Sequence, residues 1–164
     1  MFKFTNPHPE NKRVGDCVKR ACCLASEINY HDIAIMLNRF KKESGCSKFN
    51  NNDNWKPFVE EVLMGKKNKG DMQHEFYGHR YTVNDWAKWW ENDICILRCS
   101  KHLVATKDGD YLDTWDSGEK GVYIAYFMPP YQEIVEHIKK NYPKLCKGLT
   151  LERIKLWNLK NYKT

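Results

Sequence analysis

Four short stretches rich in apolar, β-branched and aromatic residues follow one another late in the chain, and they constrain the fold more than any other feature. They are residues 94–99, 102–106, 110–115 and 122–127. Asp108-Gly109 separates the second stretch from the third, and an Asp-Gly pair between two strand-like stretches is a strong signal for a tight hairpin turn. The sequence therefore predicts an antiparallel sheet in this region.

Helical patterns dominate the residues before these strands. We expect helices over residues 16–27, 31–43 and 55–64, and a short helix that begins after a Thr82 cap. The first ten residues contain Pro7 and Pro9 and are expected to be irregular. Helices followed by antiparallel strands predict an α+β fold. A chain of 164 residues can bury one ordinary core, so we expect residues 1–164 to form a single domain.

The end of the chain differs from the rest in charge. Residues 138–164 carry eight basic side chains and one acidic side chain, whereas the whole chain has a net charge of +6. The rest of the chain is therefore close to neutral. We expect residues 131–164 to form a basic helical extension, with helices over residues 132–140 and 151–159. Its apolar faces would dock on the domain and leave lysines for solvent or an acidic partner.

Cys17 is the candidate nucleophile among the seven cysteines. It directly follows Asp16, which can cap the predicted helix, so its thiol would lie at a helix N-terminus. Backbone N–H groups at this position stabilise a thiolate. Cys22 and Cys23 fall inside the helix and are expected to be buried and inert. The local sequence alone leaves open that Cys17 is an ordinary buried cysteine.

His102 supplies a possible base at the start of the second strand. A two-residue turn places Asp110 opposite Lys107 and puts Asp113 on the same face as His102. A three-residue loop would instead bring Asp116 opposite His102. Either carboxylate would hold the imidazole in the useful tautomer and stabilise its positive charge, and we prefer Asp113.

This order of parts resembles small papain-like cysteine peptidase domains, and is similar to the C39-like peptidases and their uncharacterised bacterial and phage relatives. The residues that carry the resemblance are Gly15-Asp16-Cys17-Val18 with Arg20-Ala21, His102-Leu103-Val104-Ala105, Asp108-Gly109 and Asp113-Thr114-Trp115-Asp116-Ser117. The resemblance covers the order of elements from about residue 11 to residue 127. It implies a Cys17-His102-Asp113 triad, with the nucleophile at a helix start and the helix packed against an antiparallel sheet.

The resemblance also implies an oxyanion hole, formed by the backbone N–H of the cysteine and by a glutamine about six residues before it. Asn11 stands at that position in this chain. Asparagine donates the same kind of amide hydrogen bond from a side chain that is one carbon shorter. Losing one such donor costs about 10²–10³ in rate, so the catalytic rate depends on whether asparagine can replace glutamine at this position. We expect Asn11 and the N–H of Cys17 to hold the oxyanion.

The leading functional prediction is a cysteine hydrolase that cleaves a peptide or isopeptide bond in a peptide or protein substrate, without a cofactor. No paired C-x-x-C motif occurs, so no metal site is predicted. The alternative is a protein-binding module on a papain-like fold with weak or no catalysis, such as a phage factor that acts on a host protein. Binding of nucleic acid by the basic segment is less favoured.

Two further expectations concern location and aromatic residues. The sequence has no apolar run of membrane-spanning length and no signal-peptide core after Met1, so a cytoplasmic protein without a membrane partner is predicted. Trp86, Trp89 and Trp90 have helical spacing. We interpret them as a core stripe with one exposed edge, although a platform for stacking bases or sugars is the alternative.

Overall fold

The computed structural model describes residues 1–12, 15–45, 54–70, 72 and 78–155, and these form an α+β fold. A six-stranded sheet has the order β1-β5-β4-β3-β6-β2. Its strands are β1 (Phe2–Phe4), β2 (Lys66–Lys67), β3 (Cys95–Cys99), β4 (His102–Lys107), β5 (Asp110–Asp113) and β6 (Ile124–Phe127). The helices are α1 (Cys17–Ser26), α2 (Tyr30–Ser44), the π-helix η1 (Phe58–Val62), α3 (Val83–Trp89) and α4 (Tyr131–Asn141). None of the described helices is long and apolar enough to cross a membrane.

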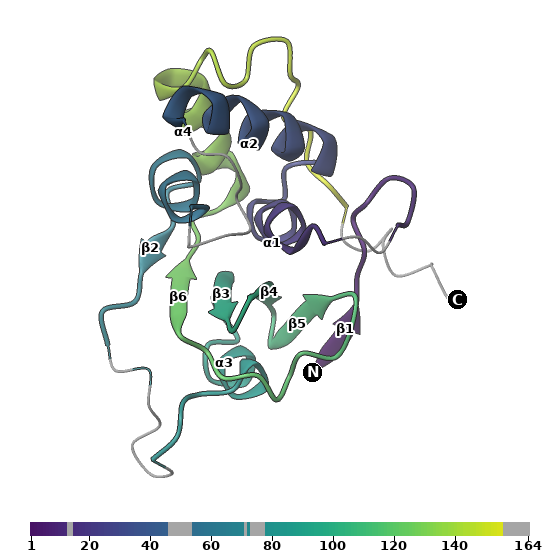
Figure 1. The fold of residues 1–164 in the computed structure, drawn as a ribbon, viewed down its shortest axis with the longest axis vertical. Coiled ribbons are helices and arrows are strands. Elements are labelled where there is room, and N and C mark those ends of the chain that lie inside the picture. Colours follow the sequence, from purple (N-terminus) through teal and green to yellow (C-terminus); the bar gives the residue numbers. More distant parts are fainter. Residues whose placement is uncertain (13–14, 46–53, 71, 73–77, 156–164) are drawn as a thin grey trace.

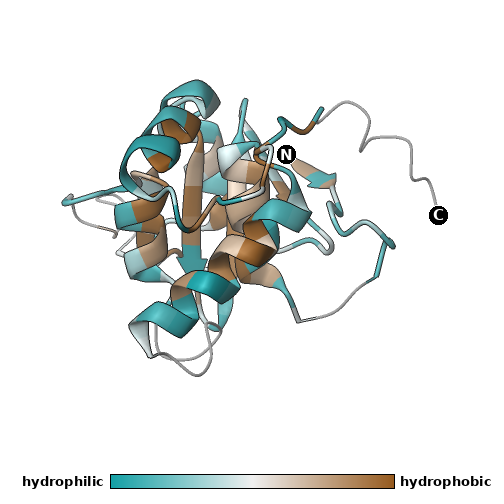
Figure 2. Ribbon diagram, turned by 90° about the horizontal axis from the view of Figure 1, so that it is seen from above, coloured by the Kyte–Doolittle hydropathy of each residue, from teal (hydrophilic) through white to brown (hydrophobic). Residues whose placement is uncertain are grey.

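Helices cover both faces of the sheet (Figure 1). α1, α2, η1 and α4 lie on one face, and α3 lies on the other. Successive strand residues point to opposite faces, so Ile96 and Ala105 join the core under α1, whereas Leu97 and Val104 join the core over α3. The helices turn their hydrophobic residues toward the sheet and their polar residues outward (Figure 2). The result is a three-layer arrangement with the sheet in the middle.

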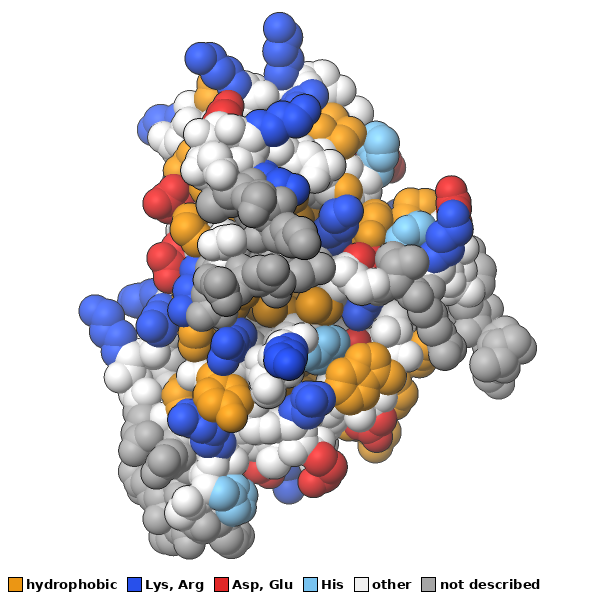
Figure 3. Space-filling model, in the orientation of Figure 1, with side chains coloured by type: hydrophobic (Ala, Val, Ile, Leu, Met, Phe, Trp, Pro, Cys, Tyr) orange, Lys and Arg blue, Asp and Glu red, His pale blue; other side chains and the backbone are white. Residues whose placement is uncertain are grey.

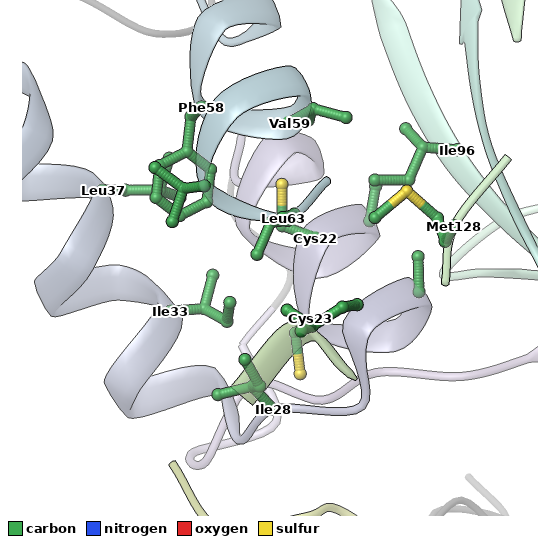
Figure 4. Packing of buried hydrophobic residues seen from close by; sticks show 14 of the residues in the cluster. Cys22, Cys23, Ile28, Ile33, Leu37, Phe58, Val59, Leu63, Ile96 and Met128 are labelled. Carbon is green, nitrogen blue, oxygen red and sulfur yellow. The ribbon is translucent and has the colours of Figure 1, made fainter. Parts of the chain in front are cut away.

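Helix α1 is held firmly within the larger core. Every residue from Arg20 to Ser26 is buried. Cys22 and Cys23 pack among apolar side chains of α2 and η1, including Ile33 and Phe58 (Figure 4). Close packing of this kind fixes a helix in position. The N-terminal end of α1, where Cys17 lies, is therefore presented on a rigid element.

The hairpin between β4 and β5 has the predicted two-residue turn. Lys107 pairs with Asp110, and the next pair along is Thr106 with Tyr111. The turn residue Asp108 has a φ of 53°, and Gly109 has a φ of 76°. Positive φ at both central residues is the requirement of a type I′ turn, which explains the Asp-Gly pair. The predicted register is confirmed.

The sheet is mixed, so the prediction of an antiparallel sheet is wrong in one respect. Part of the first ten residues, expected to be irregular, forms β1, which pairs in parallel with β5. Phe2 and Phe4 are half-buried with exposed Lys3 between them, but a three-residue alternation is too short to identify a strand in the sequence. Lys66 and Lys67 form the exposed edge strand β2, which lies outside the four stretches predicted as strands.

The C-terminal segment differs from its prediction more strongly. α4 is helical as expected, but residues 151–155 are not, and an antiparallel bridge joins Ile28 to Arg153. Five of the segment's apolar residues are buried in the same core cluster as α1, namely Ile134, Val135, Ile138, Leu145 and Leu151. The segment completes the main core and is not an accessory to it. The remainder of the helix predicted over residues 151–159 lies outside the described residues.

Candidate active site

The start of α1 places Cys17 beside a buried charge network. Asp16 occupies the N-cap position, but its carboxylate makes no capping hydrogen bond to the helix. It accepts a hydrogen bond from the Tyr30 hydroxyl at 2.6 Å and forms an ion pair with Arg20 one turn along the helix. Asp16 and Arg20 are both buried, whereas Cys17 is half-buried. The helix therefore starts at Cys17 as predicted, although the Asp16 side chain has a different role.

The surroundings of Cys17 favour its thiolate. Burial raises the pKa of Cys17, but hydrogen bonds from the His102 side chain and the Leu103 backbone lower it. Positive charge on His102 and Arg20 lowers the pKa of Cys17 further, so the net pKa lies below the ordinary thiol value. A lowered pKa increases the fraction of nucleophilic thiolate at neutral pH.

His102 lies between Cys17 and a carboxylate. Its Nε2 is 2.6 Å from Oδ2 of Asp113, and its ring centroid is 4.8 Å from that of Trp115. Burial lowers the pKa of His102, but the hydrogen bonds with Asp113 and Cys17 and the negative charge of both raise it to about 9. Because Nε2 is engaged by Asp113, Nδ1 is the nitrogen that can face the thiol. Such an arrangement supports a thiolate–imidazolium pair at neutral pH.

Asp113 has hydrogen-bonding partners on both carboxylate oxygens. Oδ2 also accepts a hydrogen bond from the Ser117 hydroxyl at 2.7 Å, and Oδ1 accepts one from the Thr114 backbone N–H at 2.8 Å. The Arg20 guanidinium is 3.8 Å from Oδ1. A buried carboxylate with these partners is held in one orientation, which in turn orients the His102 ring.

Asp116, the alternative third member, does not contact His102. Its Oδ1 accepts hydrogen bonds from the Tyr111 hydroxyl at 2.6 Å and from the Gly118 backbone N–H at 3.1 Å. The two-residue turn explains this difference, since it brings Asp113 to the His102 side of the hairpin. The structure thus brings together Cys17, His102 and Asp113, the three residues preferred from the sequence.

Asn11 lies on an exposed turn before α1 and has a φ of 51°. Its side-chain oxygen accepts a hydrogen bond from the Asn6 amide at 3.3 Å. Asn6 itself is buried and also donates to the Lys12 carbonyl at 3.1 Å. The turn is therefore organised by Asn6, and the oxyanion role expected of Asn11 and the Cys17 N–H stays a prediction.

The other described cysteines have surroundings unlike those of Cys17. Cys22 and Cys23 are fully buried, and burial raises the pKa of both, as expected for inert thiols. Burial also raises the pKa of Cys95 to about 11 and that of Cys99 to about 12. Cys17 is distinguished from these four by a pKa that is lowered.

No individual role was predicted for three side chains that support the site. Arg20 contacts two of its carboxylates, Ser117 fixes Asp113, and Trp115 packs on the His102 ring. The spacing of Asp16 and Arg20, four residues apart on a helix, was a signal for the first contact. The positions of Ser117 and Trp115 depend on the loop after β5, which gives no periodic pattern.

The tryptophan stripe is part of the second core. Trp86 is fully buried and stacks on Trp90 with ring centroids 3.8 Å apart, whereas Trp89 is 65% exposed. Thr82 and Asp85 form a capping box at the start of α3, consistent with the expected cap. The interpretation as a core stripe with one exposed edge is confirmed.

Among the described residues, no group of three or more His, Cys, Asp or Glu side chains is arranged to hold a metal ion. Comparisons with protein families, with curated proteins and with solved structures gave no match to this chain.

Proposed function

We propose that this protein is a cysteine hydrolase that cleaves an amide bond, in a peptide or an isopeptide, on a papain-like fold. The observation that carries the proposal is the continuous chain of hydrogen bonds from Cys17 through His102 to Asp113. These residues come from the start of α1, the start of β4 and the end of β5. A nucleophile, a base and an orienting carboxylate in this order form a catalytic triad.

Each member has a defined role in the proposed reaction. The Cys17 thiolate attacks the carbonyl carbon, and the carbonyl electron pair moves to oxygen to form a tetrahedral oxyanion. The oxyanion collapses as the C–N bond breaks, and His102 donates its Nδ1 proton to the leaving amine. His102 then accepts a proton from water, whose oxygen attacks the thioester. The C–S bond breaks, the acid is released, and the Cys17 thiolate and the His102 imidazolium are restored. Asp113 keeps the imidazole oriented and balances its positive charge during both the formation and the hydrolysis of the thioester.

The oxyanion would be held at the N-terminus of α1. Helix N-termini present N–H groups that lack partners within the helix, and the Cys17 N–H is one of them. Asn11 is the proposed second donor. An Asn11→Ala variant should lower turnover by about 10²-fold with little change in Cys17 alkylation, because only the transition state needs this donor.

Cleavage of amide substrates tests the proposal. We expect the protein to hydrolyse members of a quenched-fluorescent peptide library or an isopeptide-linked set, and Cys17→Ala to abolish this activity. Cys146→Ala is the matched control, because Cys146 is also a half-buried free thiol but lies in the C-terminal segment. Activity that survives in Cys17→Ala would contradict the proposal. Binding of peptides without any cleavage would favour the alternative of a protein-binding module.

A further inference from the structure

A group of cationic and aromatic side chains lies around the segment that leads into β6. Arg80 is 4.3 Å and Arg98 is 5.4 Å, by their guanidinium carbons, from the ring centroid of Tyr123. Lys120 Nζ is 5.6 Å from the ring centroid of Trp115. We call these five residues the cationic rim. Trp115 and Tyr123 are each 42% exposed, so the rim belongs to the surface.

The backbone holds the rim together. Residues 120–122 run beside residues 81–83, with hydrogen bonds from Val83 to the Lys120 carbonyl at 2.9 Å and from Val122 to the Tyr81 carbonyl at 2.8 Å. The Arg80 side chain lies over Gly121, at ordinary contact distance from where a Cβ would stand. This contact places Arg80 against the backbone of the residue that follows Lys120.

The rim borders the catalytic residues. Trp115 packs against the His102 ring and is also the aromatic neighbour of the Lys120 ammonium. Arg98 is paired across the sheet with Leu103, whose backbone hydrogen-bonds the Cys17 thiol. A substrate whose carbonyl lies at Cys17 would extend past Trp115 and the Lys120 ammonium.

Arg80 and Lys120 form no ion pair with a carboxylate in the described part of the chain. Asp116 and Glu119 are the exposed acids on the same loop, and Asp116 is engaged by Tyr111 and Gly118. Figure 3 shows one face of the molecule, on which Lys and Arg side chains lie among hydrophobic ones over the region of the strands.

We propose that the cationic rim binds an acidic side chain of the peptide substrate next to the scissile bond. Cationic groups beside a cleft attract anionic ligands and raise their association rate. The exposed aromatic faces supply apolar contact for the neighbouring peptide, with little entropy to lose on binding. This inference rests on the proposed function and assigns the substrate class of the same site. The region of the chain that holds the rim is nearly neutral overall, so its basic character is local.

Peptide chloromethyl ketones test the inference without requiring turnover. The reagents are acetylated tetrapeptides made in pairs. The two members of a pair differ at one position, which is Glu in one and Gln in the other. Each pair places this difference at another of the four positions. The measurement is the ratio of Cys17 labelling rates, Glu over Gln, in 20 mM and 500 mM salt. We expect a ratio of about 10 for at least one position at low salt, since steering by charge starts near this size. At high salt the ratio should approach 1, because salt screens charges at this range.

Substitutions test whether the cationic rim causes the preference for Glu over Gln. The Arg80→Gln/Lys120→Gln double variant should lower the low-salt ratio several-fold, whereas Lys139→Gln, an exposed lysine on α4, should not. A ratio near 1 at every position in the unaltered protein would overturn the inference and leave the proposed function standing. An equal fall of the ratio in Lys139→Gln would also overturn it, since the effect would then reflect net charge. Failure of every reagent to modify Cys17 would instead contradict the proposed function.

Discussion

The two ends of helix α1 both bury charge, but they do so for different purposes. At the C-terminal end, Glu27 is 4% exposed and adopts a φ of 61°. Its two carboxylate oxygens pair with Lys107 at the end of β4 and with Arg153 in the C-terminal segment. Glu27 thus has a cationic partner on each oxygen, and this network fastens three parts of the fold.

At the N-terminal end, the same helix carries a charge network that includes a reactive group. Arg20 lies between the carboxylates of Asp16 and Asp113, and Asp113 also binds His102. The half-buried Cys17 thiol is hydrogen-bonded to this network and remains partly accessible. The comparison teaches that buried ion pairs alone do not indicate a catalytic site. What distinguishes the N-terminal end is an accessible nucleophile whose pKa the network lowers.

The largest expected effect comes from removing the C-terminal support of α1. Deletion of residues 148–164 removes Leu151, which is fully buried, and Arg153, which pairs with Glu27. It also removes the backbone hydrogen bonds between residues 27–29 and residues 152–154. We expect loss of the cooperative thermal transition, monitored by circular dichroism. A truncated protein that melts cooperatively, with Cys17 labelled at the full rate, would show that this segment is an accessory after all.

The second largest effect should distinguish Asp113, which contacts His102, from Asp116, which does not. Asp113→Asn should lower turnover by about 10⁴-fold, because the imidazole loses its orienting acceptor. Asp116→Asn is the matched control and should change turnover by no more than a few-fold, since Asp116 contacts Tyr111 and not His102. Steady-state rates on the best library substrate provide the measurement. The reverse order of effects would mean that Asp116 orients the histidine.

Arg20→Met should affect both stability and reactivity. It leaves Asp16 and Asp113 buried without their shared cation, which should cost about 3 kcal/mol in the free energy of unfolding. It should also raise the pKa of Cys17, because the positive charge of Arg20 helps to lower it. Urea titration and the pH dependence of Cys17 alkylation measure the two effects. A loss of stability with an unchanged alkylation profile would make Arg20 a purely structural residue.

Glu27→Gln provides the counterpart at the other end of the helix. Two ion pairs become neutral hydrogen bonds, so the free energy of unfolding should fall by about 2 kcal/mol. Cys17 alkylation in the folded protein should keep its pH profile, since Glu27 lies at the opposite end of α1. A shifted profile would show that the two ends are coupled and would break the comparison.

The parts of the structure that the sequence predicted are those determined by local rules. Helical periodicity identified α1 and α2, and the Asp108-Gly109 turn determined the register that joins His102 to Asp113. Both signals act within a few residues along the chain, so they can be read without knowing the tertiary structure.

The parts that could not be predicted depend on contacts between distant segments. β1 is too short for a pattern and exists because β5 offers it a free edge. Residues 151–155 were predicted to be helical from their sequence, but their backbone instead bonds to the residues that follow α1. The cationic rim assembles Arg80, Arg98 and Lys120 from three separated positions, so no local charge pattern marks it.

The pH dependence of the site follows from the shifted pKa values of Cys17 and His102. The Cys17 thiolate forms as the pH rises through its lowered pKa, and the His102 imidazolium persists up to about pH 9. Hydrolysis should therefore fall on the acid side as Cys17 protonates and on the alkaline side, near pH 9, as His102 loses the proton that the leaving amine needs. Because the pKa of His102 is raised on folding, its contribution to stability is complete below about pH 6.5 and is lost as the pH rises through about 9.

The most direct test of the central claim, that Cys17 and His102 form an ion pair, is the rate of Cys17 alkylation by iodoacetamide against pH in the unaltered protein and in His102→Ala. Peptide mapping would confirm the labelled residue. The account predicts a profile that rises below the ordinary thiol range in the unaltered protein and moves to higher pH, by about one unit or more, in His102→Ala. Two superimposable profiles would contradict it.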